Sequence, residues 1–336
     1  MVLPSFPFLV EMEVTSACNL DCAYCFAKPF SGYTPSFDDL VYLIKKTKRE
    51  ANPFEFVLLG GEPFIRKDIL DIMTVSKETF RHYGISTNGT LFRKFSKEDF
   101  SRLREVIDER TLQVSIDSIA PEINDFGRGA TTKVIENLNL LEENEIPFTI
   151  AMVVNKKSKD TLLESVSYFL KKYKLLQVVN LMRLMPSRAL GSTFYDLVLT
   201  REEYEQVCRK ALELPESLGR PEVKVYHERN NYDGGVMMDK YAAAPPRCLA
   251  GISRAEILAN GDVTPCLMLR EVSLGNLYQH SWREIWQLSL ARYGKAMSIP
   301  SDITLCESTN AKGEAMILKR VREVNLTSFH ESVKSI

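Results

Sequence analysis

Three cysteines stand close together near the start of the chain. Cys18, Cys22 and Cys25 form the run Cys-Asn-Leu-Asp-Cys-Ala-Tyr-Cys, shortly after a strand-like run over residues 8–15. Thiolates at this spacing on a short loop can each bind one iron of a 4Fe–4S cluster, which leaves the fourth iron open to another ligand. An open iron predicts chemistry at this loop.

A zinc site is the main alternative for these thiols. Structural zinc takes four ligands, and no histidine stands at a zinc-type spacing from the cysteines; the histidines are His82, His227, His280 and His330. Three unrelated buried thiols are a weaker alternative, because free cysteines do not usually cluster in a polar loop. The alternative from another class of function is therefore a zinc-stabilised, non-catalytic binding protein.

A second motif follows the strand-like run over residues 55–59. It reads Gly60-Gly61-Glu62-Pro63, in which two glycines allow the backbone to approach a ligand closely and a carboxylate can pair with an ammonium group. In isolation such a segment is equally typical of a turn. Its position after a cysteine loop and a strand makes it specific.

The two motifs together resemble the radical SAM superfamily. The cysteine run matches the pattern C-x-x-x-C-x-aromatic-C with Tyr24 as the aromatic residue, and the G-G-E-P segment follows in the family's order. The resemblance implies that Cys18, Cys22 and Cys25 bind a 4Fe–4S cluster together with exchangeable S-adenosyl-L-methionine. It also implies that residues 60–63 bind the methionine amino group.

Two later segments resemble the family less specifically. Ser86-Thr87-Asn88-Gly89 ends a third strand, and Ser115-Ile116-Asp117 lies on a fourth. On the resemblance, Ser115 is the candidate ribose contact with Asp117 near it, and Ser86 and Asn88 belong to the same cofactor site. An ordinary strand-end serine is the alternative for Ser115.

Arg128, in the run Phe-Gly-Arg-Gly, is a candidate for the methionine carboxylate. A solvated loop arginine is the alternative for this residue. Glu11 and Glu13 share one face of the first strand and are expected to point into the interior, where a charge needs either substrate or an ion pair.

Three more cysteines, Cys248, Cys266 and Cys306, lie toward the carboxyl end. Between the first two, Asn260-Gly261 predicts the turn of a hairpin. The arrangement resembles the SPASM or twitch extension of radical SAM enzymes and implies a second iron–sulfur cluster on these three thiols. No further cysteine follows Cys306, so two auxiliary clusters are not expected, and a degenerate extension without metal is the alternative. Cys208, in a charged helical run, is expected to be a bystander.

Strand-like and helical runs alternate along the first half of the chain. Strands are predicted over residues 8–15, 55–59, 83–87, 111–117, 148–154 and 176–184. Helices are predicted over residues 38–50, 67–80, 97–107, 132–144, 159–173 and 202–214, with Ser36, Ser96 and Ser158 as amino-terminal caps. About six strand–helix units predict a parallel sheet, either doubly wound or curved into a barrel.

The resemblance narrows this to an α/β fold with a partial (β/α)6 TIM-like barrel and a small carboxy-terminal auxiliary-cluster domain. We expect the barrel over residues 1–199, a helix and a connector or lid over 200–246, and the SPASM-like domain with a terminal helix near 312–323 over 247–336. The connector is inferred from the prolines and glycines between residues 215 and 246.

Composition limits the remaining functional classes. The 336 residues carry a net charge of −1, so the charge that binding to nucleic acid or to a membrane surface needs is missing. The amino terminus lacks the pattern of a signal peptide and no long apolar run predicts a transmembrane helix. Seven cysteines suit a reducing compartment better than a disulfide framework, so we expect a cytoplasmic protein.

The resemblance also implies the reaction. Radical SAM enzymes cleave S-adenosylmethionine reductively and use the resulting 5′-deoxyadenosyl radical to remove hydrogen from a substrate carbon. The leading expectation is maturation of a ribosomal peptide or a protein residue, and the alternative is cofactor or tetrapyrrole (haem-type) biosynthesis on a small molecule. A flavodoxin- or ferredoxin-like protein is expected as the low-potential electron donor.

Overall fold

The computed structural model describes residues 5–29, 31–184, 196–227, 250–251 and 253–296. Within these residues, ten strands form one curved sheet in the order β10-β9-β8-β1-β2-β3-β4-β5-β6-β7. Strands β1 to β8 pair in parallel, and β9 and β10 are antiparallel to their neighbours. The strands are β1 Leu9–Thr15, β2 Glu55–Gly60, β3 Tyr83–Thr87, β4 Leu112–Ser115, β5 Phe148–Val154, β6 Leu176–Arg183, β7 Lys224–His227, β8 Arg254–Ile257, β9 Asp262–Thr264 and β10 Gly275–Asn276.

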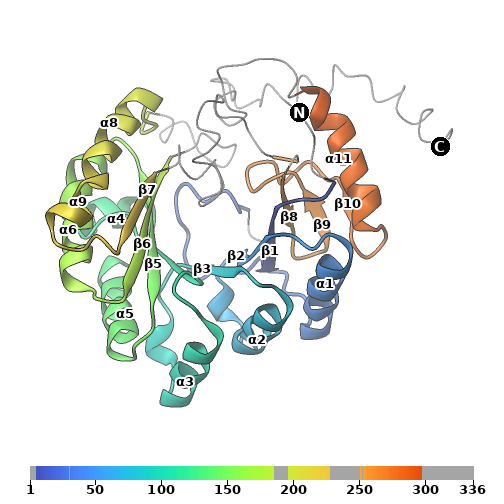
Figure 1. Ribbon diagram of the computed structural model, residues 1–336, viewed down its shortest axis with the longest axis horizontal. Coiled ribbons are helices and arrows are strands. Elements are labelled where there is room, and N and C mark those ends of the chain that lie inside the picture. Colours follow the sequence, from blue (N-terminus) through green and yellow to red (C-terminus); the bar gives the residue numbers. More distant parts are fainter. Residues whose placement is uncertain (1–4, 30, 185–195, 228–249, 252, 297–336) are drawn as a thin grey trace.

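Helices cover the outer side of this curved sheet (Figure 1). They are α1 Phe37–Glu50, α2 Ile69–Thr79, α3 Lys97–Val106, α4 Pro121–Gly127, α5 Thr131–Glu143, α6 Leu162–Lys172, α8 Arg201–Leu212, α9 Leu214–Ser217 and α11 Trp282–Ala296, with short 3-10 turns at Pro63–Ile65, Phe92–Lys94 and Lys159–Thr161. Among the described residues, none of the helices combines the length and the apolar composition that a membrane span needs.

The hydrophobic core lies between the sheet and these helices. Val10, Met12 and Val14 of β1 are fully buried and share one core with Leu40 and Leu43 of α1. Because side chains alternate along a strand, the residues between them face the concave interior of the sheet. The sequence pattern therefore separates an apolar outer face from an inner face that is free to carry polar groups.

The predicted alternation of strands and helices is confirmed, and so is the partial barrel. The expected capping boxes form at Ser36 with Asp39 and at Ser96 with Asp99. The prediction for Ser158 is wrong, since its hydroxyl makes no helix cap and instead accepts a hydrogen bond from the amide of Asn155, 3.0 Å away. The preceding turn uses the hydroxyl that a cap would need.

The sheet extends further than the six predicted strands. β7 lies inside the segment expected to be only a connector or lid and pairs with β6, while β8 pairs with β1 on the other side. Four-residue strands give too short an alternation to be distinguished from a loop. The expected terminal helix near residues 312–323 lies outside the described residues.

The carboxy-terminal region is fastened to the barrel through α1. Buried Lys46 donates hydrogen bonds to the carbonyl oxygens of Leu277 and His280, at 2.6 and 2.9 Å. The indole Nε1 of Trp282, at the start of α11, donates to Thr47 Oγ1 at 3.1 Å. Buried polar contacts of this kind fix the position of one element on another.

Candidate cofactor site

The three amino-terminal cysteines lie on the loop that leaves β1 at the carboxyl end of the sheet. This loop reaches across to the end of α4, where the amide of Ala23 donates to the carbonyl oxygen of Gly127 at 2.7 Å. Cys22 Sγ lies 3.7 Å from the carbonyl oxygen of Arg128. Cys18, Cys22 and Cys25 are all half-buried free thiols. The carboxyl edge of a parallel barrel is where such folds place their active sites.

Burial raises the pKa of all three thiols, and that of Cys18 reaches about 11. The charges of Arg128 and Lys28 act against this effect at Cys22 and Cys25, and Arg270 does so at Cys25. Metal ligation requires thiolates, so binding a cluster here releases protons and uses these nearby positive charges.

The thiol arrangement suits a cluster better than a single ion. Among the described residues, no three histidine, cysteine, aspartate or glutamate side chains converge tightly enough to hold one metal ion. Three thiolates that each bind a different iron of a cuboid need not converge on one point. The donor set therefore fits a 4Fe–4S cluster with one open iron, and it does not form a mononuclear zinc site.

The two glycines of the second motif are required by the cysteine loop itself. A Cβ on Gly60 would stand 2.3 Å from the carbonyl oxygen of Thr15, and one on Gly61 would stand 2.0 Å from that of Ala17. In the same place, the amides of Gly61 and Glu62 donate to these two oxygens at 2.8 Å. Both glycines are thus required by close approach to the backbone that leads to Cys18, and their predicted approach to a ligand stays a prediction.

Glu62 is fully buried, and its carboxylate accepts hydrogen bonds from two backbone amides and one hydroxyl group. Its Oε1 accepts from the amide of Phe64 and from Thr87 Oγ1, and its Oε2 accepts from the amide of Asn88 at 2.7 Å. Burial raises its pKa to about 7 despite these three bonds. The carboxylate thus joins Pro63 and its neighbours to the end of β3, and its predicted contact with an ammonium group stays a prediction.

The candidates on β3 lie in this same network. Asn88 Nδ2 donates to Asn19 Oδ1 in the cysteine loop at 2.9 Å, so the end of β3 also contacts that loop. Ser86 and Ser115 are half-buried, and each alternates with core residues of its strand, which places both on the concave face. Their contacts with a cofactor stay predictions.

Asp117 and Arg128 form one unit. Arg128 Nε donates to Asp117 Oδ1 at 2.8 Å, and the amide of Val153 donates to the same oxygen at 2.7 Å. The guanidinium of Arg128 also lies over the Tyr24 ring, 5.6 Å from its centroid, and its side chain is only 14% exposed. The alternative of a solvated loop arginine is therefore wrong, because this side chain is enclosed by an acid and an aromatic ring.

Tyr24 is held against α4 by a glycine. A Cβ on Gly127 would stand 2.3 Å from Tyr24 Cε1, so a larger residue there would displace the ring. Asp117 is 3% exposed, and its Oδ2 accepts no hydrogen bond from the described residues. Asp117 thus orients Arg128 beside the cysteine loop, and its predicted place in the cofactor site stays a prediction.

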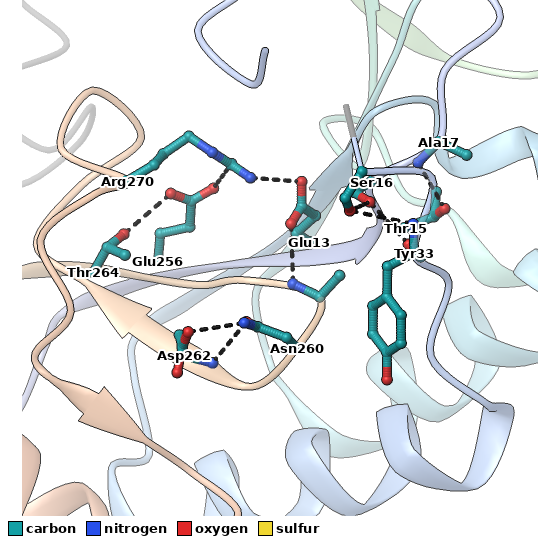
Figure 2. Close-up of polar contacts among 12 residues, drawn as sticks. Glu13, Thr15, Ser16, Ala17, Tyr33, Glu256, Asn260, Asp262, Thr264 and Arg270 are labelled. Carbon is teal, nitrogen blue, oxygen red and sulfur yellow. Dashed lines mark hydrogen bonds and ion pairs between the residues drawn. The ribbon is translucent and has the colours of Figure 1, made fainter. Parts of the chain in front are cut away.

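Charged residues line the concave face near β1 and β8 (Figure 2). Arg270 donates to Glu13 Oε1 at 2.9 Å and to Glu256 Oε1 at 2.8 Å. The hydroxyl of Thr264 donates to Glu256 Oε2 at 3.2 Å. Burial raises the pKa of Glu256 to about 8, although Arg270 acts against this. The ion-pair alternative for Glu13 is thus the one that the structure contains.

Glu11 has its own partner in the same wall. Arg254 of β8 binds both of its oxygens, each at 2.6 Å. Sequence reasoning missed Arg254, Glu256 and Arg270, because Arg254 and Arg270 bind acids of β1 that lie more than 200 positions away and Glu256 is recognised only through Arg270. The only available signal was the charged alternation at 254 and 256 beside apolar neighbours.

The second group of cysteines is described only in part. Cys266 is buried and belongs to the hydrophobic core, while Cys248 and Cys306 lie outside the described residues. The predicted hairpin is present, with β8 and β9 antiparallel and Gly261 at a φ of +84° in its turn. Cys208 is fully buried in α8, and its role as a bystander stays a prediction.

Comparisons with known proteins agree with this architecture. The model of the Radical SAM superfamily matches residues 12–169, and that of an iron–sulfur cluster-binding domain, SPASM, matches residues 248–308. An AdoMet-dependent heme synthase of Methanosarcina barkeri is 25% identical over 302 residues, which cover 85% of this chain and 84% of that protein. The antilisterial bacteriocin subtilosin biosynthesis protein AlbA of Bacillus subtilis is 25% identical over 300 residues, covering 84% of this chain and 60% of that protein.

A solved structure shares the fold. SuiB of Streptococcus suis, bound to its precursor peptide SuiA, superposes with a TM-score of 0.68 over 90% of this chain and 69% of that chain, at 16% sequence identity. The cysteine loop, the G-G-E-P segment, the curved sheet and the two matching family models lead to one conclusion. The chain belongs to the radical SAM superfamily and carries a carboxy-terminal SPASM extension.

Proposed function

We propose that the protein cleaves S-adenosylmethionine reductively and uses the radical to remove a hydrogen atom from a carbon of its substrate. When bound, the cluster supplies the low-potential electron for this cleavage. The observation that carries the proposal is the fit between the cysteine loop and its two supports. Gly60 and Gly61 hold it on one side, and α4 holds it through Gly127 on the other.

The residues of the chain then have distinct tasks. Cys18, Cys22 and Cys25 would hold the cluster. The backbone around Gly61, which packs against the chain that leads to Cys18, would offer its polar groups to the methionine amino group. Arg128, oriented by Asp117, brings its remaining N–H donors to the carboxylate, which matches guanidinium chemistry.

We infer that the substrate is a ribosomal peptide or a residue of a protein. AlbA and SuiB are named for bacteriocin biosynthesis and for a complex with a precursor peptide, respectively. A maturase of this kind is an oxidoreductase that acts on a chain rich in amide groups. In its carboxy-terminal part, Cys248, Cys266 and Cys306 would hold an auxiliary cluster, and a flavodoxin- or ferredoxin-like donor in the cytoplasm would deliver electrons.

A second candidate is haem-type biosynthesis on a small molecule. Its support is the heme synthase relative, of which this chain spans 84%. The two candidates share every step at the cofactor site. They differ in what the concave face of the sheet must bind.

Anaerobic reconstitution tests the shared part of the proposal. The purified protein should be brown, bind about four irons for each intact cluster and release 5′-deoxyadenosine when reduced with S-adenosylmethionine. Replacing Cys18, Cys22 and Cys25 together by alanine should abolish 5′-deoxyadenosine formation and remove about four irons. Cys208→Ala, a buried cysteine outside both groups, is the matched control and should keep both.

Two results would contradict the proposal. A colourless protein that binds zinc and forms no 5′-deoxyadenosine would favour the non-catalytic binding protein. If the triple variant loses all iron, the auxiliary cluster is ruled out while the radical chemistry stands. Iron that remains in the triple variant and is lost on replacing Cys266 would support the auxiliary site.

A further inference from the structure

Glu11, Glu13, Arg254, Glu256 and Arg270 form a charged wall on the concave face near β1 and β8. A row of neutral polar side chains crosses the same face farther along the sheet, over β3 to β6. Gln113 of β4 donates from Nε2 to Ser86 Oγ of β3 at 3.0 Å and accepts at Oε1 from Asn180 Nδ2 of β6 at 2.9 Å. The three side chains thus span four neighbouring strands. We call Ser86, Gln113 and Asn180 the amide ladder.

Small residues on β5 allow the ladder to cross that strand. Thr149 is paired with Gln113 in the register of the sheet, and Ala151 is paired with Asn180. Both are buried and short, so the longer side chains of Gln113 and Asn180 meet above them. A bulky residue at either place would separate the two amides.

The ladder faces the interior. Ile85, Leu112, Val114, Val179 and Leu181 belong to the hydrophobic core on the helix side. The ladder residues alternate with these core residues and are half-buried, so they present polar atoms to the space enclosed by the sheet. Tyr226 of β7, paired with Asn180 in the register, extends the same face.

The ladder has hydrogen-bonding capacity left over. A primary amide has two N–H donors and an oxygen with two lone pairs. The bonds within the ladder use one donor of Gln113 and one of Asn180, and they fix the planes of both groups. Each amide therefore offers one further N–H and oxygen lone pairs in a set direction, which is the complement of a peptide bond.

The charged wall does not favour an anionic substrate. Arg270 donates to the buried side chains of Glu13 and Glu256, and Arg254 donates to both carboxylate oxygens of Glu11. Glu11 and Glu13 balance the two guanidinium charges when Glu256 is protonated, and the negative charge is in excess when Glu256 is ionised. A substrate with several carboxylates needs positive charges beyond those already paired with acids of the protein.

We propose that the amide ladder binds a backbone amide of the substrate, so that the substrate of this site is a peptide segment and not a polycarboxylate. This rests on the proposed function, because the ladder matters only if the radical acts inside the sheet. Gln113, at the centre of the ladder, sets the specificity. Loss of one such hydrogen bond should reduce the use of a peptide about tenfold.

Deuterium transfer tests this on the reconstituted holoenzyme. One probe is a pool of acetylated, amidated tetrapeptides made from perdeuterated amino acids, and the other is a perdeuterated tetracarboxylate porphyrin. Mass spectrometry measures the fraction of 5′-deoxyadenosine that carries deuterium, which corrects for differences in total cleavage. Deuterium should come from the peptide pool, and its fraction should fall about tenfold in Gln113→Leu and in Asn180→Leu.

Gln177→Leu is the matched control, since Gln177 lies near the start of β6 and donates to the carbonyl oxygen of Leu175 at 3.2 Å. It should keep the wild-type fraction. Deuterium from the porphyrin alone, or peptide transfer that Gln113→Leu and Asn180→Leu leave unchanged, would overturn the inference. Failure of the proposed function has a separate signature, which is the lack of any 5′-deoxyadenosine with or without a probe.

Discussion

Gly61 lies so close to Ala17 that a Cβ at position 61 would stand 2.0 Å from the Ala17 carbonyl oxygen. The amide of Glu62 donates to that same oxygen at 2.8 Å. The glycine pair and the cysteine loop are therefore two halves of one backbone arrangement. The motif that was expected to approach a ligand first has to accommodate its own chain.

Gly61→Ala is expected to displace the cysteine loop. Backbone atoms cannot move aside as a flexible side chain does, so the loop must shift and the three thiols lose their arrangement. We expect iron content after reconstitution to fall by at least half. Gly84→Ala is the control, since a Cβ there would meet Thr111 at an ordinary 3.6 Å, and it should bind iron as the wild type does. Equal iron content in both variants would contradict the prediction.

Glu62→Gln is expected to destabilise the protein by about 2 kcal/mol. The carboxylate accepts three hydrogen bonds in a fully buried position, and an amide NH2 would face at least one of these donors. Urea unfolding of the variant and wild type would measure the loss. Thr87→Val removes one donor to the carboxylate and also the acceptor of the Gly89 amide, so it should destabilise the protein as well. An unchanged free energy of unfolding in Glu62→Gln would argue against this role for Glu62.

Asp117→Asn is expected to weaken binding of S-adenosylmethionine and lower stability. It leaves the enclosed Arg128 without its carboxylate, and removing one partner of a buried ion pair costs about 3 kcal/mol. Unfolding and cofactor titration of the reconstituted protein would measure the two effects. Asp71→Asn, which breaks an exposed pair with Arg102, should change stability by less than about 1 kcal/mol. Similar losses in both variants would speak against a special role for Asp117.

Glu256→Gln is expected to flatten the dependence of stability on pH. The folded state holds the pKa of Glu256 at about 8, above the ordinary 4.5, so between these values it binds more protons than the unfolded state. The free energy of unfolding therefore falls as pH rises from 5 to 8 and levels off above that range. Glutamine resembles the protonated acid and removes this fall, which is worth about 1.4 kcal/mol per pKa unit.

Urea unfolding at pH 5 and at pH 8 would check this expectation. Glu136→Gln, on an exposed ion pair with Arg93, is a suitable control and should keep the pH dependence of the wild type. A variant at position 256 with an unchanged fall would show that the acid is ionised throughout.

Periodicity in the sequence was enough to predict the first six strands and most of the helices around them. Residues such as Val10, Met12 and Val14 alternate with polar neighbours and identify both the strand and its buried face. The cofactor loop was equally accessible, because its cysteines are close in sequence. Short-range patterns in a sequence indicate short-range structure, so the cysteine loop and the G-G-E-P segment can be recognised from the sequence alone.

Contacts between distant segments could not be predicted in this way. Nothing near Glu13 indicates that Arg270 will bind it, and nothing near Gln113 indicates Asn180. The same limit applies to Asp117 and Arg128, since the sequence predicts a cofactor role for each and gives no sign that they bind one another. Polar side chains at the right spacing mark a site, while their partners depend on how the sheet closes.

The pairing of β1 with β8 has a consequence for biosynthesis. Leu9 lies beside Arg254 in the sheet, so the ribosome makes β1 long before β8, the strand that covers its open edge. Until then β1 exposes unpaired backbone, and Glu11 and Glu13 lack their arginines. A chain shortened before residue 254 would keep that edge, and the amino-terminal barrel alone should therefore self-associate in the cell.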